Sequence, residues 1–274
     1  MEVLRPGEND KCRLCFGATS FKFKLMVLSK YNVYYCQCTT CGSLQTEYPY
    51  WLDEAYANNA LSRFDTGAGQ RSINNFTASY IVSRIYQANN VLDIGGGDGL
   101  LCRLLRDYEI NCFVKDKYAN STYAQAYVEH DFLTPDLVLG FEVIEHFVNP
   151  SSDLGELFKM DAETVLLSTT TYSNEGEDWW YLAPESGQHV FFYSVKALRI
   201  IAEGYGYSFT RSGGFIVFSK NKSSFKQNLA IILLGFSIMR YLKGWLVTRQ
   251  AKGVWKDYLA QIEKTRGAKK IYED

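Results

Sequence analysis

The stretch that most restricts the fold of this chain is an apolar run that ends directly in a cluster of glycines. Residues 90–94 read NVLDI, residues 95–99 read GGGDG, and the following LLCRLLRDY has the composition of a helix. Glycines at such a junction allow a sharp turn and let a ligand approach the backbone at the amino end of the helix. A strand, a glycine turn and a helix in this order predict a binding site for a nucleotide-like cofactor.

The glycine spacing and two nearby acids indicate which cofactor this site accepts. The glycines fall as G-x-G-x-G from Gly95 to Gly99, not as the G-x-G-x-x-G of dinucleotide sites. Asp93 lies just before them, where a carboxylate repels a pyrophosphate but attracts an ammonium group. Asp116 ends the next apolar stretch, where it either accepts the hydroxyls of a ribose or caps a helix. Tyr118 follows, where its ring can lie against an adenine.

Strand-like and helix-like segments alternate from residue 76 onward. We expect strands at 90–94, 111–115, 136–141, 164–170, 208–212 and 215–220, and helices at 76–87, 99–108, 119–127, 151–160 and 194–206. This alternation predicts a mostly parallel sheet covered by helices on both faces. Before it, residues 51–62 have a helical composition, and the polar stretch 63–75 is expected to form a loop or lid.

Two C-x-x-C pairs near the N-terminus predict a metal site. They are separated by 22 residues and consist of Cys12, Cys15, Cys38 and Cys41. Four thiolates on two tight turns form a closed, tetrahedral and therefore structural zinc site, because no position is left for water. The alternative is a set of reduced, buried cysteines without a metal. Cys102 and Cys112 lie in the later helix and strand pattern and are expected in the core.

Taken together, these motifs resemble class I S-adenosylmethionine-dependent methyltransferases. Residues 91–99 look like the first motif of that family, and FEVIEH at 141–146 looks like its segment after the fourth strand. The cysteine pairs, WLDEAY at 51–56, GQH at 187–189 and FYS at 192–194 are similar to zinc-ribbon-bearing methyltransferases of sugar and surface-polysaccharide pathways, relatives of the deoxysugar C-methyltransferases. The resemblance implies an α/β, Rossmann-like sheet of seven strands, a small N-terminal zinc ribbon and S-adenosylmethionine as cofactor.

The resemblance also implies roles for individual residues in cofactor binding. Asp116 would hold the ribose, and Phe141 would flank the adenine. Arg71 lies in a segment similar to a lid over the cofactor, and it would meet the cofactor's carboxylate. The methionine part would be held by Asp93, Gly95, Gly97 and Gly99.

The stretch 177–194, EDWWYLAPESGQHVFFYS, is expected to contain the acceptor site. It follows the strand at 164–170, whose carboxyl end faces the ligand crevice of a doubly wound sheet. His189 is therefore expected near the transferring methyl group, as a general base. Three aromatic residues of this loop either offer flat faces to a pyranose or close the core: Trp179, Trp180 and Tyr181.

The FEVIEH segment supplies a second set of candidate catalytic residues. His146, beside Glu145, is the second candidate base, unless it caps the following segment or bonds a carboxylate structurally. Glu142 either lines the pocket or fixes the turn.

Two departures from the resemblance bear on the expected reaction. The deoxysugar C-methyltransferases tend to have Y-x-E-H where this chain has SGQH at 186–189, and they usually carry a further C-terminal domain for which residues 221–274 are too few. We therefore expect methyl transfer to a hydroxyl of a sugar or polysaccharide intermediate, free or linked to a nucleotide or lipid. The alternatives are C-methylation of a keto-sugar nucleotide and a non-catalytic scaffold. RNA is not the expected partner, because residues 8–50 hold only five basic residues and no basic stripe.

These features divide the chain into a zinc ribbon at 1–50, a linker helix and lid at 51–75, a methyltransferase domain at 76–220 and a helical tail at 221–274. The tail contains eleven Lys or Arg against four acids. It can dock on an anionic membrane surface, form a homodimer or cover the edge of the sheet. The N-terminus does not resemble a signal peptide, and the cysteine usage fits a reducing compartment, which predicts a cytoplasmic location, in solution or at the inner face of the membrane.

Overall fold

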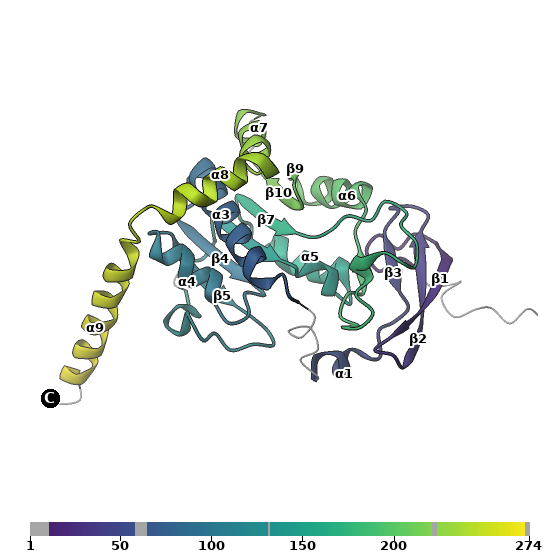
Figure 1. Ribbon diagram of the computed structural model, residues 1–274, viewed down its shortest axis with the longest axis horizontal. Coiled ribbons are helices and arrows are strands. Elements are labelled where there is room, and N and C mark those ends of the chain that lie inside the picture. The colour runs from purple at the N-terminus through teal and green to yellow at the C-terminus, as the bar shows by residue number, and fades with distance from the viewer. Residues whose placement is uncertain (1–10, 58–64, 131, 221–223, 272–274) are drawn as a thin grey trace, which may run out of the picture.

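The computed structural model describes residues 11–57, 65–130, 132–220 and 224–271, and two β-sheets organise them (Figure 1). The larger sheet has the strand order β5-β4-β6-β7-β10-β9. Its strands are β4 (Asn90–Ile94), β5 (Asn111–Lys115), β6 (Leu137–Phe141), β7 (Thr164–Ser168), β9 (Ser208–Ser212) and β10 (Phe215–Ser219). The first four pair in parallel, whereas β10 is antiparallel to β7 and β9. The predicted mostly parallel α/β sheet is confirmed.

This sheet has six strands in the described parts of the chain, where the resemblance implied seven. The helix expected at 119–127 is also wrong, because only the short 3-10 helix η1 (Gln125–Tyr127) forms there. The backbone N–H groups of Thr122 and Tyr123 both donate to the carbonyl of Asp98, at 2.8 and 2.9 Å. Donors committed to the glycine turn are not free for the i to i−4 bonds of a helix.

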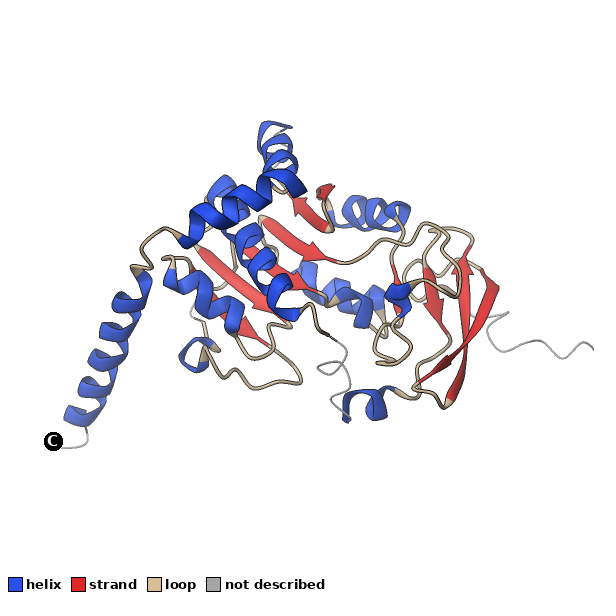
Figure 2. Cartoon of the chain, viewed as in Figure 1, coloured by secondary structure: helices blue, strands red, loops and turns tan. Residues whose placement is uncertain are grey.

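Helices cover both faces of the large sheet (Figure 2). One face carries α3 (Ala68–Tyr86) and α4 (Leu100–Asp107), and the other carries α5 (Pro150–Lys159) and α6 (Val195–Tyr205). Alternate residues of a strand point to opposite faces, and β6 shows this. Leu137 and Leu139 pack with α3 and α4, whereas Val138 packs with α5 and α6.

Helix α3 begins eight residues earlier than expected. Residues 68–75, predicted as part of a loop or lid, continue the helix that carries the buried segment Phe76–Ser83. An internal glycine such as Gly69 costs a helix only about 1 kcal/mol, which the burial of the following two turns offsets. The expected helix at 51–62 is seen as α1 (Leu52–Ala57), and residues 58–62 lie outside the described part.

The smaller sheet joins the N-terminal region to the loop at 177–194. It has the order β1-β2-β3-β8, formed by β1 (Thr19–Val27), β2 (Tyr31–Cys38), β3 (Leu44–Thr46) and β8 (Phe191–Phe192). Two side chains strengthen this junction. Arg13 donates to the carbonyl of Val190 at 2.6 Å, and the indole of Trp51 donates to the carbonyl of Gly187 at 2.8 Å. The N-terminal sheet therefore holds one side of that loop in place.

The predicted helical tail forms three helices in the described part of the chain: α7 (Ser224–Leu233), α8 (Phe236–Val247) and α9 (Gly253–Ile271). Leu234, Met239 and Leu246 are buried in the core that also contains residues of α3 and α4. Part of the tail therefore packs on the face of the large sheet that α3 and α4 cover. In the described part, no single helix is long and apolar enough to cross a bilayer. The bent pair Phe225–Leu233 and Ile238–Val247 meets that test together, by length and composition only.

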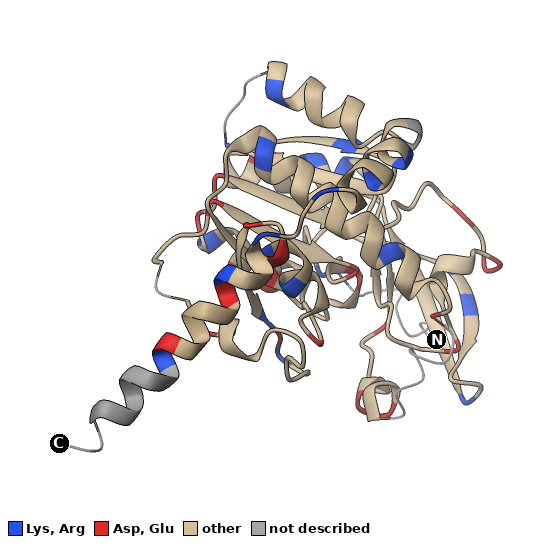
Figure 3. Cartoon of the chain, turned by 60° about the vertical axis from the view of Figure 1, so that its left-hand side comes forward, with Lys and Arg blue, Asp and Glu red and all other residues tan. Residues whose placement is uncertain are grey.

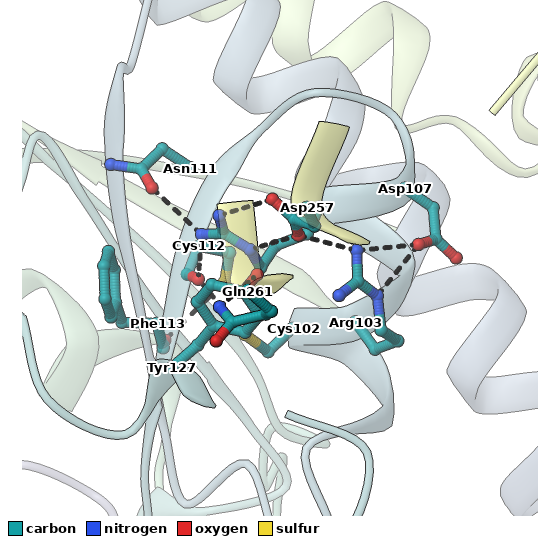
Figure 4. Close-up of polar contacts among 10 residues, drawn as sticks. Cys102, Arg103, Asp107, Asn111, Cys112, Phe113, Tyr127, Asp257 and Gln261 are labelled. Carbon is teal, nitrogen blue, oxygen red and sulfur yellow. Dashed lines mark hydrogen bonds and ion pairs between the residues drawn. The ribbon is translucent and has the colours of Figure 1, made fainter. Parts of the chain in front are cut away.

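Helix α9 projects from the body, with basic residues along the tail that leads to it (Figure 3). Its N-terminal half is fixed to α4 by Asp257, which forms ion pairs with Arg103 and Arg106; Figure 4 shows the pair with Arg103. The Asp257 carboxylate accepts from Arg106 Nε at 2.7 Å, from Arg106 Nη2 at 2.9 Å and from Arg103 Nη2 at 2.8 Å. The backbone of Gly253 also lies close to the end of α4, since a Cβ on this glycine would lie 1.8 Å from the carbonyl oxygen of Arg106.

Candidate functional site

The glycine turn follows β4 at the carboxyl edge of the parallel strands. Gly95 has a φ of +63°, and a Cβ on it would lie only 2.7 Å from Cγ2 of Val143. A Cβ on Gly97 would meet no atom within 4 Å. The turn therefore packs against the FEVIEH segment at Gly95. It leaves open space at Gly97, where a ligand can approach the backbone.

Asp93 lies beneath this turn as a buried carboxyl group. It is 2% exposed, and its Oδ2 has no hydrogen-bond partner among the described residues. Burial raises the pKa of Asp93 to about 8, and the carboxylate of Asp116 adds to the increase. A buried oxygen without a partner is costly, and an ammonium group would satisfy it. The amino-acid end of S-adenosylmethionine fits this observation.

Asp116 connects the turn to the loop after β5. Its Oδ2 accepts the N–H of Gly97 at 2.9 Å, and its Oδ1 accepts the N–H groups of Tyr118 and Ala119 at 2.7 and 2.8 Å. A carboxylate has about four acceptor positions, so a position is left for a ribose hydroxyl. Tyr118 is 72% exposed and stacks on Tyr56, with ring centroids 5.3 Å apart.

Two further predicted cofactor residues lie near this region in different settings. Phe141 ends β6 and packs edge-on against Phe215, with ring centroids 6.1 Å apart. Arg71 lies on α3, not in a loop, and forms an ion pair with Asp65. Their contacts with adenine and with the cofactor's carboxylate stay predictions.

Glu142 fixes the turn after β6. Its backbone has a φ of +53°, in the left-handed region that is uncommon for a residue with a side chain. Ser168 holds this conformation from the neighbouring strand, because its hydroxyl accepts the Glu142 N–H at 3.1 Å and donates to Oε1 at 2.6 Å. Glu145 follows in the 3-10 helix η2 (Ile144–His146) and is fully buried.

Glu145, His146 and His189 come together although the two histidines are 43 positions apart in the chain. The two imidazole rings have their centroids 5.0 Å apart. Burial, together with the nearby His189, lowers the pKa of His146 to about 3. Burial also lowers the pKa of His189, whereas it raises the pKa of Glu145 well above its usual range. Both imidazoles are therefore neutral near pH 7.

Tyr181 holds this cluster at two points. Its hydroxyl donates to Oε1 of Glu145 at 2.6 Å, and its carbonyl pairs with Nδ1 of His189 at 2.7 Å. The ring is 2% exposed, so the expectation that Tyr181 offers a free face to a sugar is wrong, and the core-closing alternative applies. Trp179 packs partly buried against Phe192, whereas Trp180 is 74% exposed.

Sequence reasoning missed the contribution of Tyr56 to this site. Its hydroxyl lies 3.5 Å from Nδ1 of His146, and its ring stacks on Tyr118 at the ribose end of the cofactor site. Gln188 reinforces the contact, because its side-chain amide donates to the carbonyl of Ala55 at 3.1 Å. The WLDEAY segment was visible in the sequence, but nothing in it showed which distant residue it would meet.

The four cysteines of the two C-x-x-C pairs also converge. Their sulfur atoms lie within 4.8 Å of one another, with Cys12 to Cys41 at 3.7 Å and Cys15 to Cys38 at 3.5 Å. Tetrahedral Zn–S bonds of about 2.3 Å place sulfurs about 3.8 Å apart, so the cluster fits a zinc ion. Cys36, Cys102 and Cys112 are buried elsewhere.

Comparison with known proteins agrees with the cofactor site. Residues 63–212 match the family described as "Methyltransferase domain", which is more than half of the chain. The chain therefore belongs to this methyltransferase family. More specifically, it is a class I S-adenosylmethionine-dependent methyltransferase, as its glycine turn and α/β sheet predicted. No curated protein matches the sequence.

Several solved structures are distantly similar. The methyltransferase domain of bacterial CtHen1 is 18% identical, with 53% of this chain and 96% of that chain covered and a TM-score of 0.35. An O-methyltransferase family protein from Burkholderia thailandensis is 14% identical, with 61% and 59% covered and a TM-score of 0.42. The plantazolicin methyltransferase BamL is 12% identical, with 74% and 88% covered and a TM-score of 0.46.

Proposed function

We propose that this enzyme transfers a methyl group from S-adenosylmethionine to a hydroxyl group of a sugar or polysaccharide intermediate. One observation carries the proposal, namely the contact between the glycine turn and the FEVIEH segment. Gly95 packs directly on Val143, so the cofactor turn adjoins the cluster of Glu145, His146 and His189. An acceptor held at that cluster would lie beside the methyl donor.

The cofactor supplies an electrophilic methyl group on a sulfonium centre. The chain must then hold the acceptor hydroxyl in line and accept its proton as the new C–O bond forms and the C–S bond breaks. Both imidazoles have Nδ1 next to a backbone carbonyl, Gln188 for His146 and Tyr181 for His189. Each neutral ring therefore donates from Nδ1 and retains a lone pair on Nε2. His189 is our first candidate base and His146 the second.

Support for a sugar acceptor comes from the loop that follows β7. Trp180 presents an exposed indole in the loop that carries His189, and such a flat apolar surface suits the C–H face of a pyranose. The tail helices provide a basic surface for a phosphate-linked or lipid-linked acceptor at a membrane, or a surface for a homodimer. The same site also allows C-methylation of a keto-sugar nucleotide, which is the alternative.

We further propose that Cys12, Cys15, Cys38 and Cys41 bind a structural zinc ion. Two backbone N–H groups, from Thr40 and Cys41, point to Sγ of Cys38 at 3.4 Å. Such bonds stabilise a thiolate in a zinc site. Because β3 pairs with β8, the zinc would also stabilise the loop that carries His189.

The test begins with calorimetric titration by S-adenosylhomocysteine of the wild type and of Asp93→Ala. We expect binding to the wild type and a loss of binding in the variant. Incubation with isotopically labelled S-adenosylmethionine and a panel of nucleotide-linked and lipid-linked sugars would then identify the acceptor by mass spectrometry. NMR of the product separates a methyl ether from a methyl group on carbon. A folded protein that binds no S-adenosylhomocysteine would contradict the proposal.

A further inference from the structure

We propose that Glu145, His146 and His189 form a binding site for a divalent first-row transition-metal ion, separate from the four cysteines. Each of the three residues can offer one ligand atom, a carboxylate oxygen or a ring nitrogen, and these atoms lie within 4.8 Å of one another. Two imidazoles and one carboxylate are a common donor set for Fe²⁺ and Zn²⁺.

Both histidines have the kind of hydrogen-bond partner that metal-ligating histidines usually have. A histidine that binds a metal through one nitrogen almost always donates its other N–H to a carbonyl or carboxylate, which fixes the tautomer and the ring. Here Nδ1 of His146 pairs with the carbonyl of Gln188 at 3.0 Å, and Nδ1 of His189 pairs with the carbonyl of Tyr181 at 2.7 Å. The nitrogen left with a lone pair is Nε2 in both rings.

Glu145 provides an independent observation that points to a cation. The residue is 0% exposed, and its Oε2 has no hydrogen-bond partner among the described residues. Its Oε1 is held by the Tyr181 hydroxyl, which also reaches Oε2 of Glu142 at 3.3 Å. In the described part of the chain, no Lys or Arg forms an ion pair with Glu145. A buried carboxyl oxygen without a hydrogen-bond partner destabilises the folded state, and a metal ion bound to this oxygen would remove that cost.

The chemical role of the ion deepens the proposed function and rests on it, whereas metal binding itself does not. A divalent ion lowers the pKa of an oxygen bound to it, so an acceptor hydroxyl on the ion would lose its proton more easily. In that case the two histidines act as ligands, and the ion takes the place of the histidine base. Metal dependence of the reaction therefore decides between these two mechanisms.

Mn²⁺ is the appropriate probe, because it is paramagnetic and carboxylate ligands suit it, whereas the soft thiolates of the four cysteines do not. We would titrate the full-length protein, loaded with one zinc ion per chain, with Mn²⁺ and follow free and bound ion by electron paramagnetic resonance. We expect one Mn²⁺ per chain, with ¹⁴N couplings from histidine in the pulsed spectrum. Glu145→Gln and His189→Gln should each weaken binding by about 100-fold or more, given that loss of even an outer-shell partner costs about 10–100-fold.

His130→Gln is the matched control, since this exposed histidine lies outside the cluster and pairs with the carbonyl of Phe132. It should bind Mn²⁺ like the wild type. If a cluster variant does not fold, Tyr181→Phe tests the same site, because it removes only the hydroxyl that holds Glu145. We expect it to weaken Mn²⁺ binding by about 10-fold or more.

Two outcomes would overturn the inference: no saturable Mn²⁺ binding by the wild type, or Mn²⁺ binding that is unchanged in folded Glu145→Gln and His189→Gln. Titration with S-adenosylhomocysteine in parallel separates this failure from failure of the proposed function. A protein that binds the cofactor but no Mn²⁺ refutes the metal site alone. A protein that binds Mn²⁺ but no cofactor refutes the proposed reaction alone.

Discussion

Substitution of Asp93 by asparagine tests how the cofactor site works. In the folded protein, burial raises the pKa of Asp93 from an ordinary value of 3.8 to about 8, so this carboxyl group is protonated at neutral pH. An ammonium group beside this carboxyl favours its ionised form, so cofactor binding should release the proton. The affinity for S-adenosylhomocysteine should therefore increase with pH until the carboxyl is ionised in the free protein as well.

The size of the effect follows from the pKa. With a pKa of about 8, roughly 3% of the free protein has Asp93 ionised at pH 6.5 and roughly 75% at pH 8.5, so affinity should rise about 25-fold over this range. Calorimetry at the two pH values, in two buffers of different ionisation enthalpy, measures both the affinity and the released proton. Asp93→Asn should bind weakly at both pH values and release no proton.

The same shift predicts the stability of the cofactor-free protein. Because the folded state keeps a proton that the unfolded state loses above pH 4, stability contributed by this group falls as pH rises toward 8. The loss is at most about 5 kcal/mol, from about four pKa units at 1.36 kcal/mol each. Asp93→Asn should therefore gain stability over the wild type at pH 8.5 and much less at pH 5.

Asp98→Asn is the matched control, since this acid lies on the same turn with an exposed side chain. It should keep the wild-type pH dependence in both experiments. If the wild type binds S-adenosylhomocysteine equally well at pH 6.5 and 8.5, with no proton release, then Asp93 does not face the ammonium group and the reasoning is refuted.

Three other substitutions, one of them with a control variant, test separate parts of the structure. Cys41→Ser should lower the zinc content measured by elemental analysis from one ion per chain and loosen the β3–β8 junction in hydrogen exchange; a zinc-free wild type would contradict this. Asp257→Asn should cost about 2 kcal/mol in chemical unfolding, because two partly buried arginines of α4 lose their anion, and should speed hydrogen exchange in α9. Glu263→Gln, at an exposed position of α9, is the control and should change neither the free energy of unfolding nor hydrogen exchange in α9. Trp180→Ala should raise the KM for a sugar acceptor several-fold without changing S-adenosylhomocysteine affinity, since its ring is 74% exposed; an unchanged KM would remove this residue from the acceptor site.

Local sequence signals predicted much of the cofactor half of the site. The β4 run, the glycine turn and the start of α4 are contiguous, so their geometry depends mostly on neighbouring residues and on glycine conformations. The same applies to the two cysteine turns. Predictions failed where a long-range contact competed with local preference. The helix expected at 119–127 is absent because Thr122 and Tyr123 donate to Asp98, and this partner lies on another segment.

The acceptor half shows the limit of sequence reasoning more clearly. His189 and His146 were identified as separate candidate bases, and only the fold shows that their rings lie 5.0 Å apart and share Glu145 as a neighbour. Tyr181 was expected to face a sugar, yet it is buried and holds the cluster. Tyr56 reaches the site from the N-terminal region, and nothing in the sequence showed which distant residue it would meet.

The sequence by itself determined the fold class and the methyltransferase family, because hydrophobic periodicity and glycine placement act over a few residues. The tertiary structure alone decided which polar groups are buried together without enough partners. Asp93 and Glu145 each keep one oxygen without a hydrogen-bond partner in the described structure. Burial depends on segments brought together from across the chain. Burial shifts the pKa values of these groups and makes the binding of a cation by an unpaired oxygen favourable.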